Sequence, residues 1–438
     1  MAEDKMDAIV VGAGVAGSAA AIKLASAGQQ VLLVDRAKPI GSKNLSGGVI
    51  WGHDLEDVLP GWWKEGLAAG AIERPITQKG VNFLTKESGF TIQFGTEAWK
   101  REPHNAFTVL RAKFDKWLSE AAAAKGAMVV DGVNVEKLAR DKTGRVVGVE
   151  QGGDVINADV VILADGCNSR LGMELGIRGK LDRHHYVLGV KEVIQLDEKR
   201  IQERFHVGPN EGVAHEYVLG YLENGAKAGG FLYTNRDTIS LGVVISLDSI
   251  WEKGVYTHKI MEDFRLHPSV APLLAGGDLV EYGAHLIPEG GLHCVPQLYG
   301  DGWLVVGDAA GFVYSNGLVI HGMNYAVRSG ILAAEAVLEA KTAGAPGAKS
   351  QLWRYADKVE RSFILQDLKK FDGMHEFVWD DNIHGPIPRL VEGIFTSLFT
   401  ADGKPKRLAR EIALEEIKKQ GLSKIGLAKT ALKGAGSV

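Results

Sequence analysis

The chain has 438 residues, 45% of them hydrophobic and 24% charged, with a formal net charge of −4, which indicates a folded protein of two or three domains rather than a disordered one. The slightly acidic balance argues against a nucleic-acid-binding protein, because such proteins carry a strongly basic domain. Two cysteines exclude a disulfide framework and an ordinary four-cysteine iron–sulfur cluster, and no apolar run is long enough for a membrane span, so we expect a soluble or peripheral cytoplasmic protein.

The first segment reads as strand, helix and strand over residues 8–11, 18–27 and 31–34. A glycine turn with the spacing G-x-G-x-x-G joins the first strand to the helix, and Asp35 follows the last glycine by 18 residues. Such a turn admits a pyrophosphate at the helix N-terminus, and an acid at the end of the second strand binds a ribose. We therefore predict an ADP-containing cofactor, held by Gly12, Ala13, Gly14, Gly17, Asp35 and Arg36.

Further short apolar segments predict strands of the same sheet at residues 129–130, 146–150, 160–163 and 303–306. Turn-forming pairs end two of these strands, and a helix is expected to begin at Arg111. Another helix is expected to begin at Met323, where backbone N–H groups face a ligand. The residues at these turns and helix starts, which the family resemblance below makes site candidates, are Arg111, Asp165, Gly166, Asp308, Gly322 and Met323.

Alternating apolar and polar residues between 181 and 292 predict a second, antiparallel sheet, and helical periodicity dominates after residue 323. We therefore expect a discontinuous first domain (residues 1–180 and 293–345), an inserted sheet domain (181–292) and a helical C-terminal region (346–438). The basic stretch 418–433 is interpreted either as a membrane or partner contact or as a solvated tail.

Several single features have both a functional and a structural interpretation. His321, next to Gly322, is a weak candidate for proton transfer, since imidazole titrates near neutral pH. His184 and His185 are interpreted as surface or satisfied core histidines. Trp62 and its neighbour Trp63 are interpreted as core residues, and Cys167 as a small buried filler.

The glycine turn, the Asp165-Gly166 pair and the Gly307-Asp308 pair, in this order, resemble the signatures of hydroxybenzoate-hydroxylase-type flavoproteins. The resemblance implies a doubly wound domain that binds FAD non-covalently, with Asp308 at the ribityl chain, Asp165-Gly166 close to the pyrophosphate and Arg111 near the FAD. Within this superfamily, the segment Gly41–Gly48 is similar to electron-transfer-flavoprotein:quinone oxidoreductases of the short, FixC-like branch. Ser46, Gly47 and Gly48 thereby become cofactor-binding candidates.

This resemblance also implies partners. Electrons would arrive from a two-subunit electron transfer flavoprotein and leave toward quinone, in a bifurcating NADH-oxidising complex at the cytoplasmic membrane. No cysteine follows Cys294, so the iron–sulfur cluster would lie on a small ferredoxin-like subunit. An aromatic monooxygenase, an isoprenoid (geranylgeranyl) reductase and a non-catalytic docking subunit are the alternatives. The catalytic group would be the flavin itself, and we assign no metal site.

Overall fold

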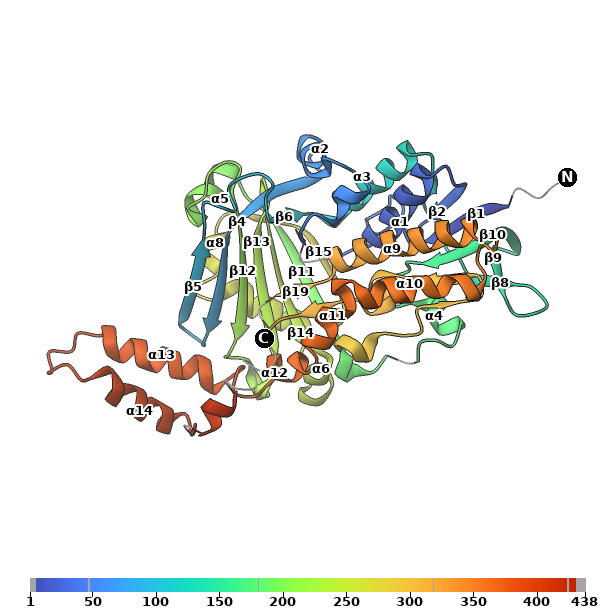
Figure 1. Cartoon of the computed structure of the whole chain (residues 1–438). Helices are drawn as coiled ribbons and strands as arrows, with labels where there is room; N and C mark the ends of the chain where they lie inside the picture. The colour runs from blue at the N-terminus through green and yellow to red at the C-terminus, as the bar shows by residue number, and fades with distance from the viewer. Residues whose placement is uncertain (1–4, 46–47, 180, 318, 424, 431–438) are drawn as a thin grey trace.

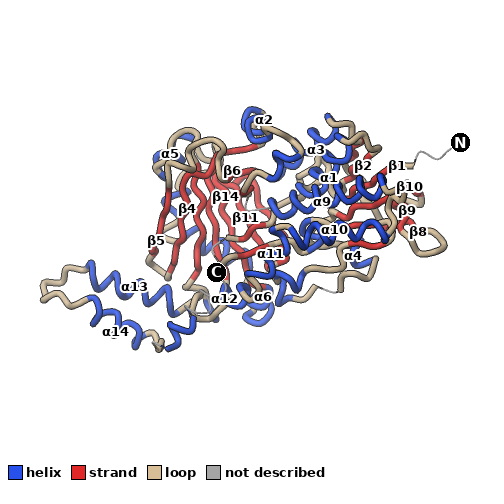
Figure 2. Tube along the Cα trace, in the orientation of Figure 1, coloured by secondary structure: helices blue, strands red, loops and turns tan. Residues whose placement is uncertain are grey.

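A computed structural model describes residues 5–45, 48–179, 181–317, 319–423 and 425–430. A mostly parallel sheet with flanking helices forms one end of the body, and a larger, mostly antiparallel sheet forms the other (Figure 1, Figure 2). A pair of helices near the C-terminus projects away from the larger sheet (Figure 1). The α/β fold class predicted from the sequence is thereby confirmed.

The first sheet has the strand order β16-β17-β10-β1-β2-β7. Its central strand β1 pairs in parallel with β10 and β2, and the register sets Val11 beside both Leu163 and Val34. Parallel strands buried on both faces read as continuous apolar runs, as β2 does. The chain therefore leaves β2, β1 and β10 at the same edge of the sheet, where their carboxyl ends lie side by side. The strands are β1 (Met6–Val11), β2 (Val31–Val34), β7 (Met128–Val130), β8 (Lys137–Arg140), β9 (Val146–Gln151), β10 (Asp154–Leu163), β16 (Tyr299–Gly300) and β17 (Trp303–Val305).

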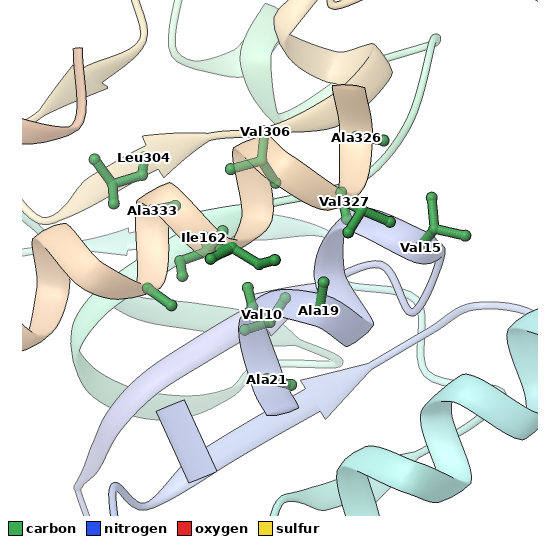
Figure 3. Packing of buried hydrophobic residues seen from close by; sticks show 14 of the residues in the cluster. Val10, Val15, Ala19, Ala21, Ile162, Leu304, Val306, Ala326, Val327 and Ala333 are labelled. Atoms are coloured by element: carbon green, nitrogen blue, oxygen red, sulfur yellow. The ribbon is translucent and has the colours of Figure 1, made fainter. Parts of the chain in front are cut away.

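Two helices, α1 (Val15–Ser26) and α9 (Met323–Thr342), pack against each other beside this sheet. Their small residues, with apolar residues of β1, β10 and β17, form the main core (Figure 3). A Cβ built on Gly330 of α9 would lie 2.1 Å from the Ala16 carbonyl oxygen, so the two backbones touch. This contact places the start of α9 near the start of α1.

The second sheet is wider than the predicted insertion, because it also takes β3, β4, β5 and β6 from residues 49–109. Strand β4 pairs in parallel with β12, more than 100 residues later, and the other pairs in this sheet are antiparallel. Local periodicity cannot report such a distant pairing. The strands are β3 (Val49–Trp51), β4 (Ile72–Leu84), β5 (Gly89–Gly95), β6 (Ala106–Val109), β11 (Tyr186–Gln195), β12 (Gly212–Leu219), β13 (Ala228–Thr234), β14 (Thr238–Ser246) and β15 (Asp278–Pro288).

Alternate residues of the second sheet face two different surroundings. One face packs on helices α5 (Glu198–Phe205) and α7 (Thr257–Leu266) through Ile201, Phe205 and Phe264. The other face carries Phe231 and Tyr233 and turns toward the first domain. Short elements complete the body: β18 (Tyr314–Ser315), β19 (Ile320–His321), α2 (Trp62–Ala68), α3 (Arg111–Ala124), α4 (Arg170–Glu174), α6 (Leu247–Lys253) and α8 (Ala271–Leu274).

The chain after α9 is helical, as the periodicity predicts. Helices α13 and α14 form the projecting hairpin, which touches β5 where Phe395 stacks on Phe90 with ring centroids 5.0 Å apart. Residues 400–408 at the tip of the hairpin are exposed. The helices are α10 (Lys349–Arg361), α11 (Phe363–Lys370), α12 (Met374–Val378), α13 (Pro386–Phe399) and α14 (Ala409–Lys419).

Candidate functional site

A pocket of about 470 Å³ runs from the carboxyl edge of the first sheet to the inner face of the second. Elements far apart in the sequence supply its walls, since β1, α1, β2, α3, α9, β15 and the turn after β10 all reach it. The candidate residues that it brings together are Gly12, Gly14, Asp35, Arg36, Gly48, Arg111, Asp165, Gly166, Asp308, Gly322 and Met323. Ser46 and Gly47 lie outside the described residues.

Two glycines of the turn, Gly12 and Gly17, leave no room for a side chain. Gly12 has a φ of 107°, and a Cβ there would lie 2.1 Å from the Ala164 carbonyl oxygen. A Cβ on Gly17 would lie 1.9 Å from the Gly12 carbonyl oxygen. No side chain caps the start of α1 at Gly14, so the first N–H groups of the helix stay available for an anion.

Asp35 closes the turn from the end of β2. Its Oδ2 accepts a hydrogen bond from the Ala13 N–H at 2.8 Å, and its Oδ1 accepts one from the Ala37 N–H at 2.7 Å. Each carboxylate oxygen has a second lone pair that can accept a ribose hydroxyl. Ala13 therefore acts through its backbone, by orienting the acid.

Arg111 lies over the turn, because a Cβ on Gly14 would come within 3.4 Å of the Arg111 Nη2. The guanidinium donates two hydrogen bonds of 2.6 Å to the two oxygens of Asp115, which is fully buried. This bidentate pair fixes the direction of the positive charge at the first residue of α3. Arg111 is therefore a largely buried, paired charge and not a solvated one at a helix start.

Asp165 contributes a buried oxygen that lacks a partner. The Leu171 N–H donates to Oδ2 at 3.1 Å, whereas Oδ1 has no hydrogen-bond partner among the described residues. Burial raises the pKa of this carboxyl to about 6. A ligand that donates a hydrogen bond in the pocket would satisfy Oδ1.

Asp308 lies in the turn after β17, beside the N-terminus of α9. A Cβ on Gly322 would lie 3.9 Å from the Asp308 Oδ1. Burial raises the pKa of Asp308, while the positive charge of Arg111 opposes this shift. The carboxyl thus lies within the influence of the Arg111 charge and next to a helix start without a side-chain cap.

These features fit FAD: a cramped glycine turn, free N–H groups at α1, and an unpartnered carboxyl oxygen on Asp165. The turn and Asp35 would hold the ADP half, Asp165 and Gly166 would lie near the pyrophosphate, and Asp308 and Gly322 would lie near the flavin half. When bound, FAD supplies electron transfer in steps of one or two electrons. The chain's residues would position it and shield it from water.

His321 lies next to the pocket, because Ile320 and Gly322 on either side of it in the sequence line the pocket. Its ring is 5.3 Å from the Trp51 ring and 5.4 Å from the Tyr314 ring, centroid to centroid. Burial, assisted by the nearby charge of Lys79, lowers its pKa to about 4. The imidazole is therefore neutral at pH 7, and its role in proton transfer stays a prediction.

The other residues with two interpretations are structural. Trp62 and Trp63 are buried and pack on Phe107. Cys167 is buried in a small cluster with Tyr186 and Cys294, and burial raises the pKa of its thiol, so the thiol stays protonated. The exposed His184 pairs with Asp248 at 2.6 Å, and His185 stacks on His293.

The sequence did not single out a polar cluster on the inner face of the second sheet. The Tyr233 hydroxyl donates to the carboxylate of Glu216 at 3.0 Å, and the Lys79 ammonium lies 3.3 Å from the same oxygen. These residues come from β13, β12 and β4, so their meeting depends on the long-range strand pairing. Glu216 and Tyr233 line the pocket.

The far end of the pocket is largely apolar. Strands of the second sheet, the end of α12 and the segment after it close this end. Among the described residues, no group of histidine, cysteine, aspartate and glutamate side chains could hold a metal ion. The apolar lining residues here are Val218, Phe231, Val244, Leu286, Phe377, Val378 and Ile383.

Solved structures share this fold at low sequence identity. A geranylgeranyl bacteriochlorophyll reductase-like protein from Thermoplasma acidophilum superposes with a TM-score of 0.68 at 19% identity, over 95% of this chain and 97% of that one. A flavin-dependent brominase superposes with a TM-score of 0.61 at 17% identity, over 95% and 100% of the two chains. At these identities the likeness concerns the fold alone.

Family models and curated relatives are more specific. An FAD binding domain matches residues 5–207, an ETF-QO ubiquinone-binding domain 186–287, and an ETF-QO/FixC family C-terminal domain 374–438. A probable electron transfer flavoprotein-quinone oxidoreductase of Escherichia coli K12 is 42% identical over 99% of both chains. Protein FixC of the same strain is 40% identical over 99% of both chains, and that of Azorhizobium caulinodans is 37% identical over 93% of both. The chain is a flavoprotein oxidoreductase of the ETF-QO/FixC family.

Proposed function

We propose that this chain accepts electrons from an electron transfer flavoprotein onto FAD and passes them to quinone. The observation that carries the proposal is one continuous pocket, which joins the dinucleotide turn to the apolar far end described above. We call this far end the apolar chamber. A quinone head group in that chamber would lie next to the flavin half of the cofactor. The chamber walls exclude water, and the α9 N-terminus favours negative charge on the reduced cofactor.

We also propose that the residues named above bind the cofactor. We further propose that a small ferredoxin-like subunit carries the iron–sulfur cluster and that the complex bifurcates electrons from NADH. Both cysteines of the chain are buried and free, so neither is placed to ligate an exposed cluster. A second subunit with cluster cysteines is the simplest source of that centre.

We also propose a peripheral contact with the cytoplasmic face of the membrane. No helix within the described ranges is long and apolar enough to cross a bilayer. The hairpin of α13 and α14 instead exposes Phe399 and Leu408 at its tip, with Lys404, Lys406 and Arg407 between them. Apolar side chains flanked by lysine and arginine suit an anionic lipid surface. The hairpin begins directly after the pocket residue His384.

Anaerobic stopped-flow spectroscopy on the FAD-loaded protein tests the electron path. We expect a reduced electron transfer flavoprotein to bleach the flavin, and a short-tailed quinone to restore its absorbance. Rapid bleaching by NADPH alone would instead support a monooxygenase or an isoprenoid reductase. A flavin that never changes redox state in the reconstituted complex would support a docking subunit.

A chamber variant separates the two half-reactions. Gly229 lines the pocket, and its nearest neighbour to a built Cβ, the Tyr217 carbonyl oxygen, is 3.5 Å away. Gly229→Leu would fill the chamber without a severe clash. We expect it to slow reoxidation by quinone and to leave reduction by the electron transfer flavoprotein unchanged. Equal slowing of both steps would contradict a quinone site in this chamber.

A further inference from the structure

Two buried polar side chains at the far end of the pocket have an atom without a partner. Glu289 is 3% exposed and His384 is 9% exposed, and both line the pocket. The Glu289 Oε1 and the His384 Nδ1 have no hydrogen-bond partner among the described residues. A buried polar atom left unpaired costs about 1–3 kcal/mol. Because neither atom has a partner in the described part of the fold, a ligand in the pocket is needed to pair them.

The hydrogen bonds that do exist leave both atoms able to accept a hydrogen bond. The Trp379 Nε1, which can only donate, lies 2.7 Å from the Glu289 Oε2. The His384 Nε2 lies 2.9 Å from the Val378 carbonyl oxygen, which can only accept, so Nε2 carries the proton. Burial lowers the pKa of His384 to about 4, so the ring is neutral at pH 7 and Nδ1 keeps its lone pair.

Trp379 positions the two acceptors relative to each other. Its indole stacks on the His384 ring, with centroids 5.4 Å apart and planes 10° apart, while its N–H holds Glu289. The chain segment after α12, which carries Trp379 and His384, pairs with the residue that precedes β13: the Lys227 ammonium lies 2.8 Å from the Asp381 carboxylate. Both acceptor side chains are therefore held against one indole at the pocket wall.

We propose that Glu289 and His384 recognise the reduced quinol, whose two hydroxyl groups donate hydrogen bonds, in preference to the quinone. Quinone oxygens only accept, so they would leave both buried acceptors unpaired. This inference rests on the proposed quinone-reducing function. Tighter binding of the quinol raises the two-electron potential of the bound couple, by about 30 mV for each tenfold preference.

The test uses Glu289→Gln in the FAD-loaded protein. The Trp379 N–H still requires an acceptor, so the amide oxygen takes that place and the NH₂ group faces the pocket. An acceptor thereby becomes a donor without a change of volume. We expect the preference for quinol over quinone to fall about tenfold, because a hydrogen bond to a charged group contributes about 1.5–3 kcal/mol.

The measurement is anaerobic calorimetric titration with a short-tailed benzoquinone and, separately, with its dithionite-reduced quinol. His384→Phe keeps the stacked ring, removes the second acceptor, and is expected to lower the preference about fivefold. The control is Glu192→Gln, a buried glutamate on β11 that does not line the pocket. FAD content and circular dichroism show that each variant is folded.

The outcomes separate two failures. A quinol preference in the parent protein that only the two pocket variants reduce supports the inference. Suppose that the parent protein binds both forms, and that Glu289→Gln and His384→Phe change the ratio of the two dissociation constants no more than Glu192→Gln does. The role of the acceptor pair is then refuted, and the quinone site stands. If the parent protein binds neither form, the proposed function falls, and the inference falls with it.

Discussion

Replacing Gly330 by alanine should separate α9 from α1. The added Cβ would lie 2.1 Å from the carbonyl oxygen of Ala16, which is backbone and cannot rotate away. Overpacking a tight contact costs about 1–3 kcal/mol, and this one belongs at the upper end. Alanine in a helix recovers roughly 1 kcal/mol relative to glycine. We expect the free energy of unfolding to fall by about 2 kcal/mol.

The assay is urea denaturation of the FAD-free protein, followed by a fluorescence titration with FAD. Because α1 and α9 both begin at the pocket, a shift between them should also raise the FAD dissociation constant. Gly179→Ala is the control, since no atom lies within 4 Å of its built Cβ. That substitution should change stability by less than about 1 kcal/mol. Gly330→Ala with unchanged stability and unchanged FAD affinity would refute the close-contact argument.

Three further predictions concern charge. Because burial raises the pKa of Asp165 to about 6, the FAD-free folded state binds a proton that the unfolded state releases, and stability falls as pH rises from about 4 to about 6. Asp165→Asn should therefore stabilise the FAD-free protein by up to about 3 kcal/mol at pH 7.5 and by nothing below about pH 4, as measured by urea titration. Arg111→Lys should weaken FAD binding and destabilise the fold by about 1–3 kcal/mol, because lysine cannot bond both oxygens of the buried Asp115; calorimetry showing parent-like affinity would contradict this. The double variant Lys404→Glu with Lys406→Glu should lose at least about 30-fold in affinity for phosphatidylserine vesicles, at about 1 kcal/mol per basic residue, in a sedimentation assay; equal binding of the parent protein and the variant would exclude the hairpin as the contact.

The sequence alone determined the features whose signals are local. The glycine spacing from Gly12 to Gly17, the apolar run of β2 and the following Asp35 lie within 24 residues, and each follows from backbone sterics and strand–helix periodicity. The family resemblance extended this to FAD and to the ETF-QO/FixC family, which the relatives confirm. Helical periodicity likewise located α9 and the C-terminal helices.

Tertiary structure alone decided the far side of the pocket. β4 joins β12 across more than 100 residues, and this pairing brings Lys79 to Glu216. Glu289 meets the indole of Trp379 across 90 residues, and no local sequence pattern predicts that contact. Periodicity reports which face of an element is buried, but it does not report which distant element covers that face. Both polar clusters therefore became visible only when the two sheets and the C-terminal segment were placed together.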